Sequence, residues 1–590
     1  MTTRRFGSAF PLLCGAALAS LAVPAAAAPA DDLTALMDDI YAARLEASPV
    51  SASAAGVEDY DSDLGDYSVA AMDRWAAKDA AFLARLNAID ASVLPPLRQA
   101  DYAITRRLLA ESIDGNRFGQ RLIAFSSYSS PWQSWAGIGD SMQFASGQDY
   151  REYLDRLHAI PAASAQVIAN TRAGIAGGYV LPCVTLGGLE GSVRGAVAAA
   201  PEDTRFYTPF TRARPADVSE AEWTALKESA RAIIADVVAK TYREAADMLR
   251  DEYVPACTKT VGISAQTDGP AFYQYRVGAS TTTDYTAQQI HDIGMAEVAR
   301  ISAEMDRVAA DAGYPDRAAF VEKLRTDPAY YAATPDELMA AAAAQAKAID
   351  GMMPDYFHLL PRLPYGIRAI PAETAEGTTT AYYQPGSPAN GTAGYYYVNT
   401  SKLDQRPLWE LPALTAHEAV PGHHHQIALQ QELDLHPLRR EFGYFTAFTE
   451  GWGLYAERLG IDMGLYDTPE KDYGRLSYEM WRACRLVVDT GIHALGWTKG
   501  QAVDFMTEHT ALSAANIDAE VNRYISWPGQ ALGYKMGELK IRELRARAEE
   551  RLGARFDLAA FNDAVIAQGP VPLDVLDAQI ERWMAEVEAG

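Results

Sequence analysis

Hydrophobic residues recur at helical spacing along most of this 590-residue chain, and few segments show the alternation that is typical of strands. Hydrophobic residues make up 49% and charged residues 22%, which is the balance of a globular protein with a buried core. The pattern therefore predicts a mainly α fold. The predicted helices span residues 31–48, 69–90, 217–250, 286–312, 335–350, 442–459, 481–493, 533–552 and 573–588.

Strand patterns are confined to short parts of the chain. Residues 272–277 are one predicted strand, and residues 378–383 and 394–399 are a predicted hairpin around a turn rich in Pro, Gly, Ser and Asn. We therefore expect a small antiparallel β-sheet just before residue 410. It would lie in a region at 261–590 that follows a mostly helical region at 29–260, and the two are compatible with one continuous domain.

Residues 1–28 have the pattern of a secretory signal peptide. Arg4 and Arg5 precede an apolar run over residues 10–23, and small residues that suit cleavage follow it. The run is too short to span a bilayer comfortably, and no later stretch has 18 apolar residues without a charge. We therefore expect a periplasmic or secreted protein with no stable membrane insertion once the signal is removed.

The net charge of −25 argues against partners that need a basic surface. Nucleic-acid binding requires a positive footprint, and docking on an anionic membrane requires basic residues as well. Four cysteines are too few for a disulfide framework, and Cys14 leaves with the signal peptide. A single disulfide between Cys183 and Cys257 is compatible with the sequence, which does not decide whether it forms. The sequence does not decide the oligomeric state either.

The strongest chemical signal is a cluster of histidines. The chain has ten histidines, and four of them lie within nine residues, at His417, His423, His424 and His425. Glu418 directly follows the first of these. A His-Glu pair followed by a further His is the pattern of zinc hydrolases, in which imidazoles bind the metal and the Glu is the general base.

The spacing of these histidines does not fit a regular helix. In the common H-E-x-x-H motif, the two ligands are four residues apart and share one helix face. Residue i+6 lies roughly 120° around a helix and residue i+7 lies about 10.5 Å along it, so neither would share an ion with His417. Pro421 and Gly422 can bulge the turn and bring the second ligand back. We favour His423 over His424 as that ligand.

A carboxylate on the next predicted helix would complete the metal site. Glu450 lies 27 residues after His423, which suits a helix–loop–helix return to the metal. Gly451 and Gly453 each destabilise a helix by about 1 kcal/mol, so a close approach to the metal helix would explain them. Glu457 shares the helix face of Glu450 and is a candidate partner that orients a ligand histidine.

A predicted helix downstream carries candidates for substrate binding. Arg482, Arg485, Asp489 and His493 share an arc of about 80° on an otherwise apolar helix. This stripe would either form a buried network or line a cleft in which an arginine binds a peptide carboxylate.

Further candidates lie outside that helix. Arg523 is a candidate for substrate binding, and Tyr524 and Tyr534 are candidate catalytic donors to a developing oxyanion, unless they are core aromatics. Tyr396 is a substrate-binding candidate in the predicted hairpin, where residues 395–398 could form a sheet edge for a substrate backbone.

Three sequence runs carry a specific resemblance. They are HEAVPGHHHQ from residue 417, TEGWGLYAE from residue 449 and RYISWPGQALGYKMG from residue 523, and residues 275–298 add to them. Together they resemble a large bacterial family known only as domain of unknown function 885, over most of the mature chain. That family is similar to the gluzincin metallopeptidases, such as thimet oligopeptidase. The resemblance implies a zincin-like fold, with two helical lobes around a deep cleft.

The resemblance also implies roles for residues of the histidine cluster. His417, His423 and Glu450 would bind one Zn²⁺ ion, and Glu418 would be the general base. The expected function is hydrolysis of oligopeptides by an exported zinc metallopeptidase. Two alternatives are a non-catalytic exported protein that binds a metal or peptide, and a zinc hydrolase of a non-peptide amide. Glu418 favours an enzyme, because a binding protein needs ligands but no base.

Overall fold

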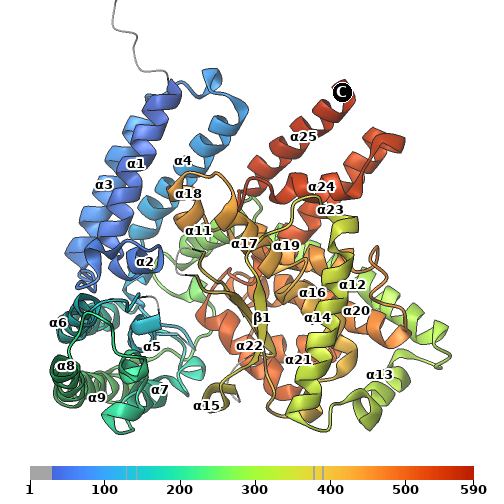
Figure 1. The fold of residues 1–590 in the computed structure, drawn as a ribbon. Helices are drawn as coiled ribbons and strands as arrows, with labels where there is room; N and C mark the ends of the chain where they lie inside the picture. The colour runs from blue at the N-terminus through green and yellow to red at the C-terminus, as the bar shows by residue number, and fades with distance from the viewer. Residues whose placement is uncertain (1–28, 128, 141, 376–378, 389–390) are drawn as a thin grey trace, which may run out of the picture.

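The chain is mainly α-helical, as the sequence predicts, and the part that the structure describes contains one three-stranded sheet (Figure 1). The predicted signal peptide lies outside the described residues. The computed structural model describes residues 29–590 except 128, 141, 376–378 and 389–390.

The N-terminal helices fill the left side of Figure 1, and those from α5 onward surround a hydrophobic core of their own. Ser219 is the N-cap of a long helix, and its side chain accepts a hydrogen bond from the Glu222 backbone N–H. A π-helical turn at Ile234–Val238 joins its two parts, α8 and α9, so the predicted helix over 217–250 is largely continuous. The helices of this part are α1 (Pro29–Ala47), α2 (Pro49–Ala54), α3 (Val69–Asn87), α4 (Pro96–Asn116), α5 (Pro131–Ala136), α6 (Gly147–Gly177), α7 (Leu189–Gly195), α8 (Glu220–Ile233), α9 (Ala239–Met248) and α10 (Val254–Ala256).

The middle of the chain contains one wrong prediction. The predicted strand at 272–277 lies inside a helix, α11, which has Pro270 in its first turn and buries Tyr273 and Val277. Packing of these side chains outweighs a local aromatic pattern that resembles a strand. The helices here are α11 (Gly269–Thr281), α12 (Ala287–Asp311), α13 (Arg317–Thr326), α14 (Pro335–Tyr356) and α15 (Ala372–Ala375).

The sheet is mixed, whereas the sequence predicts an antiparallel one. β2 (Ala381–Gln384) pairs antiparallel with β3 (Gly394–Val398), which confirms the hairpin, but β1 (Tyr365–Ala369) pairs with β3 in parallel. β3 is therefore the central strand. The prediction that residues 395–398 form a free sheet edge is wrong, because both sides of this strand are already paired. Tyr396 lies on its buried face and is fully buried.

The C-terminal half supplies most helices of the candidate site, drawn in orange and red in Figure 1. In this half the sequence predicts helices over 442–459, 481–493, 533–552 and 573–588, and each of them is present. The second of these begins at residue 469 in the structure, twelve residues before the predicted start. The helices are α16 (Leu411–Glu418), α17 (His423–Glu432), α18 (Pro437–Phe442), α19 (Thr446–Leu459), α20 (Pro469–His493), α21 (Lys499–His509), α22 (Ala514–Ser526), α23 (Leu532–Leu552), α24 (Leu558–Ile566) and α25 (Leu573–Ala589).

Several contacts join the N-terminal and C-terminal parts. Leu438 packs into one core with residues of α1, and Ile104 of α4 shares another core with Phe445.

A disulfide joins Cys183 to Cys257, so the bridge that the sequence leaves open is present in the structure. Among the described residues, no helix has both the length and the apolar character needed to cross a membrane.

The crossing of α19 and α23 leads to a test of the packing. A Cβ atom added to Gly537 would lie 1.7 Å from the Ala447 carbonyl oxygen, which is backbone and cannot rotate away. We therefore expect Gly537→Ala to lower the free energy of unfolding by more than about 2 kcal/mol. Denaturant unfolding followed by circular dichroism measures this change.

Gly351→Ala is the matched control for that experiment. Gly351 is exposed in α14, and no atom lies within 4 Å of a Cβ added there. Alanine should raise the free energy of unfolding by up to about 1 kcal/mol, because it is the better helix former. Equal stabilities of the two variants would contradict the close α19–α23 contact.

Candidate metal centre

A break in the helix brings the two histidines together. α16 ends at Glu418 and α17 begins at His423, so the chain between them leaves the helix completely, whereas the sequence predicts a bulge. The indole N–H of Trp452, on α19, donates to the Pro421 carbonyl at 2.8 Å and holds this connection in place. The ring centres of His417 and His423 lie 4.7 Å apart.

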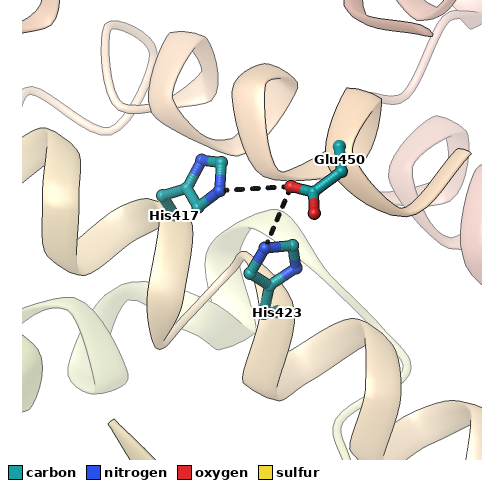
Figure 2. Close-up of side chains that lie close together, drawn as sticks. All are labelled: His417, His423 and Glu450. Atoms are coloured by element: carbon teal, nitrogen blue, oxygen red, sulfur yellow. Dashed lines mark ion pairs between the residues drawn. The ribbon is translucent and has the colours of Figure 1, made fainter. Parts of the chain in front are cut away.

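Glu450 completes a cluster of three possible ligands. Its Oε2 atom lies 3.7 Å from Nε2 of His417 and 3.4 Å from Nε2 of His423. Figure 2 shows the two imidazoles, from α16 and α17, pointing at this carboxylate on α19. The three ligand atoms lie within 4.8 Å of one another, and both histidines are buried. Two imidazole nitrogens and a carboxylate oxygen form a donor set that zinc takes in proteins.

Glu457 fixes the orientation of His417. Its Oε1 atom lies 2.8 Å from Nδ1 of His417, and the Arg482 guanidinium lies 3.4 Å from the same oxygen. This bond leaves Nε2 directed at Glu450. Burial lowers the pKa of His417, but the hydrogen bonds that it donates to Glu450 and Glu457 outweigh this effect and raise the pKa to about 9. Without a metal, His417 is therefore held as a cation between two carboxylates.

One of the two glycines in α19 explains how the helices approach each other. A Cβ atom on Gly453 would lie 2.7 Å from Cε1 of His417, so the imidazole packs directly on the α19 backbone. This is the close approach that the sequence predicts. The other glycine, Gly451, faces α23 at Gly537 and does not contact the metal helix.

The two remaining histidines of the run point elsewhere. Nδ1 of His424 lies 3.0 Å from the Tyr383 hydroxyl, and the His424 ring packs on Tyr365. Nε2 of His425 lies 2.8 Å from the Leu359 carbonyl oxygen. Among the described residues, the structure thus places His423, and not His424, in the three-residue cluster.

Glu418 is close to the cluster, and its charge is one of the causes that raise the pKa of His417. It is the last residue of α16 and is 9% exposed. Within the described ranges its carboxylate has no ion pair or side-chain hydrogen bond. The Tyr396 hydroxyl faces the same region: burial, followed by the charge of Glu418, raises its pKa and keeps it protonated.

The charged stripe on α20 forms a buried network, which is the first of the two predicted alternatives. Arg482 binds Glu457, and Arg485 donates to the Tyr524 hydroxyl and to Glu520. Substrate binding by these buried arginines is therefore not supported by their positions.

His493 has no nitrogen left for a substrate. Its Nδ1 accepts a hydrogen bond from the Ile263 backbone N–H at 3.1 Å, and its Nε2 lies 2.9 Å from the Tyr524 carbonyl oxygen. Asp489, on the same stripe, accepts hydrogen bonds from the Tyr273 hydroxyl and the Gly529 backbone N–H. The predicted substrate-binding role of His493 is a structural role in this fold.

The two candidate oxyanion donors differ in their surroundings. The Tyr524 hydroxyl donates to Glu520 and accepts from Trp481 and Arg485, so it is fully used. The Tyr534 hydroxyl accepts a bond of 3.2 Å from Arg523 and can still donate its own proton.

Tyr444 is a residue that the sequence reasoning missed. It is 58% exposed, while burial of its hydroxyl end and the negative charge of Glu450 raise its pKa. The charges of Tyr534 and Arg523 also influence this pKa, so both side chains lie near the Tyr444 hydroxyl. An aromatic residue six positions before Glu450 is the only signal that the sequence gives.

The fold and this cluster define a mainly helical protein with a buried centre of two histidines and one glutamate. A family model described as "Bacterial protein of unknown function (DUF885)" matches residues 49–580, and the chain belongs to this family. The resemblance drawn from the three sequence runs is thereby confirmed. No curated protein matches the chain.

Two solved structures are similar to this chain. The crystal structure of the "putative lipoprotein" from Colwellia psychrerythraea is 27% identical, with a TM-score of 0.87 over 95% of this chain and 100% of that one. The structure of a "putative lipoprotein of unknown function" from Shewanella oneidensis is 20% identical, with a TM-score of 0.69 over 94% and 100% of the two chains. The second likeness shows the fold alone.

Metal binding gives a direct test of which histidine is the ligand. We expect His423→Ala to weaken Zn²⁺ binding at least about 100-fold, because one of three protein ligands is lost. His424→Asn should change it less than about 3-fold, since His424 lies outside the cluster. Competition titration with a chelator dye measures both affinities, and the reverse order would assign the site to His424.

The pH dependence of Zn²⁺ binding gives a second test. A metal must displace the proton that His417 carries in the metal-free protein, and the pKa of this group is about 9. Apparent affinity should therefore rise by about tenfold for each pH unit between about pH 6.5 and about pH 8.5. Glu457→Gln should flatten this slope, because it removes one of the two carboxylates that raise the pKa. An affinity independent of pH in the wild type would contradict the charged pairing of His417.

Proposed function

We propose that this protein is an exported zinc-dependent peptidase that hydrolyses oligopeptides. The observation that carries the proposal is the position of Glu418. It directly follows one possible ligand, lies beside the cluster of His417, His423 and Glu450, and forms no ion pair or side-chain hydrogen bond in the described ranges. A protein that only binds a metal has no use for a carboxylate in this position.

The residues of the cluster fit a zinc ion. Their donor atoms are close enough to share one ion, and Glu457 orients His417 in the way that carboxylates orient zinc-bound histidines. A zinc ion held there would supply Lewis-acid chemistry, that is, activation of water and polarisation of a carbonyl. We propose one such ion per chain.

The protein groups have distinct roles in this proposal. Glu418 takes a proton from the attacking water and passes it to the leaving amine. A hydroxyl that stays protonated is needed to donate a hydrogen bond to the oxygen of the scissile carbonyl. Tyr444 and Tyr534 are better placed for this than Tyr524, because Tyr524 already uses its hydroxyl within a buried network.

Export rests on two observations. Residues 1–28 have the sequence pattern of a secretory signal, and the similar protein from Colwellia psychrerythraea is described as a "putative lipoprotein". We propose a periplasmic or secreted location and peptides as substrates. The acidic composition gives no support to a nucleic-acid partner.

The decisive experiment compares wild type with Glu418→Gln. Both proteins should bind one Zn²⁺ ion, and the variant should lose peptide cleavage by about 10²- to 10⁴-fold, the range for loss of a general base. A mixed peptide library analysed by mass spectrometry measures cleavage and also shows which end of the peptide is read. Glu441→Gln is the matched control, because Glu441 is a surface residue paired with Arg440 and its loss should leave activity unchanged.

The remaining outcomes separate the alternatives. Zinc in both proteins without cleavage by either one would favour a binding protein or a hydrolase of another amide. Cleavage that survives in Glu418→Gln would reject Glu418 as the base.

A further inference from the structure

A second site lies where the N-terminal and C-terminal parts of the chain meet. It is a cavity of about 290 Å³ whose walls come from residues 120–126, 129, 181–182, 260–276 and 525–528. The Ser526 hydroxyl oxygen accepts a hydrogen bond of 3.1 Å from a backbone N–H at residue 127 and so ties two of these walls together. Junctions between parts of a fold are common places for ligand pockets. The residues of the metal centre do not line this cavity.

Arg276, on α11, is the one charged side chain among the described lining residues. Its Nε–H donates to the Pro528 carbonyl at 3.3 Å, which fixes the position of the guanidinium. Across the described part of the chain, the two Nη atoms have neither a hydrogen bond nor an ion pair, and they are not sealed among protein atoms. Four N–H donors of a permanent cation therefore remain for a ligand.

The nearby carboxylates Asp489 and Glu111 favour the charge of Arg276 electrostatically, but neither forms an ion pair with it. Asp489 accepts hydrogen bonds from Tyr273 and from the Gly529 N–H, and burial raises its pKa to about 7. Glu111 is paired with Arg107 at 2.8 Å, and burial raises its pKa as well. Neither carboxylate lies within 4.0 Å of the Arg276 guanidinium. A cation that has no direct ion pair in a cavity is costly unless an anion binds it for part of the time.

We propose that this cavity binds a carboxylate carried on a small apolar group. The planar fork of Arg276 matches a carboxylate in two parallel hydrogen bonds. The walls beside it are mainly apolar and include Phe272, Ile263 and Ile525. The cavity is at the low end of the ~300–1,000 Å³ that is usual for ligand pockets, which suits one side chain with its carboxylate.

Two sources could supply this chemistry, the C-terminal residue of a peptide and a free hydrophobic acid. Calorimetric titration of the full chain with three probes distinguishes them: N-acetyl-L-phenylalanine, its C-terminal amide, and 3-phenylpropionate. We expect both acids to bind and the amide to bind at least about 10-fold more weakly, because it lacks the charge. Tighter binding of N-acetyl-L-phenylalanine would identify a peptide end, and equal binding of the two acids would identify a free acid.

The variant Arg276→Gln tests the residue directly. It should weaken binding of the acids by about 10- to 100-fold and leave binding of the amide unchanged. Arg250→Gln is the control, because Arg250 is a surface residue paired with Asp251 at 2.6 Å and should have no effect. Failure of both acids to bind, equal binding of acid and amide, or equal binding by Arg276→Gln and wild type would each overturn the proposal.

Carboxylates also bind zinc, so the titrations are repeated on protein stripped of metal with a chelator. Binding of the acids should not change, and its loss would assign the probes to the metal centre and overturn the proposal. The inference does not depend on the proposed peptidase activity. An inactive enzyme that still binds the acids through Arg276 would leave it standing.

Discussion

The hydrogen bond between His417 and Glu457 is the contact on which the centre depends. Burial of a carboxylate costs several kcal/mol unless nearby charges offset it. Here Arg482 lies on one side of Glu457 and the His417 cation on the other, and Glu450 continues the alternation of charge towards His423. Burial disfavours ionised Glu450, but the two histidines outweigh this effect and hold its pKa well below the usual range. The cluster is thus balanced in charge before any metal is considered.

One helix, α19, positions most parts of this arrangement. Glu450 and Glu457 are two turns apart on it, while Gly453 lies between them and admits the His417 ring. The indole N–H of Trp452 donates a hydrogen bond to Pro421, in the connection between α16 and α17, and so holds this connection in place. Because that connection is not helical, the sequence spacing of six residues between His417 and His423 does not set their separation. The break replaces the geometry that four-residue spacing gives on a continuous helix.

Local patterns in the sequence predicted many of the long helices, although not α4 or α6, together with the hairpin and the members of the cluster. Helical periodicity, the Pro-Gly step and the rarity of histidine are all visible within a few residues. The parallel pairing of β1 was not predictable in this way, because it joins segments separated by some 25 residues and depends on neither strand alone. The strand predicted at 272–277 failed for the related reason that packing of α11 decides its conformation. The sequence also left open whether the charged stripe on α20 forms a buried network or lines a cleft, because its partners come from distant segments.

Those distant partners show what the stripe does. Arg482 supports the metal centre through Glu457, whereas Arg485 reaches Glu520 on α22. One and two turns further along, α20 holds the end of α22: Asp489 accepts from the Gly529 N–H, and His493 bonds the Tyr524 carbonyl.

The end of α22 that α20 holds is also a wall of the cavity beside Arg276. A single buried helix therefore contacts the metal centre near its middle and supports the cavity at its C-terminal end. Rigid packing of this kind fixes the separation of the two sites, because close-packed interiors yield little to strain. A ligand in the cavity would be held in a constant position relative to the metal centre.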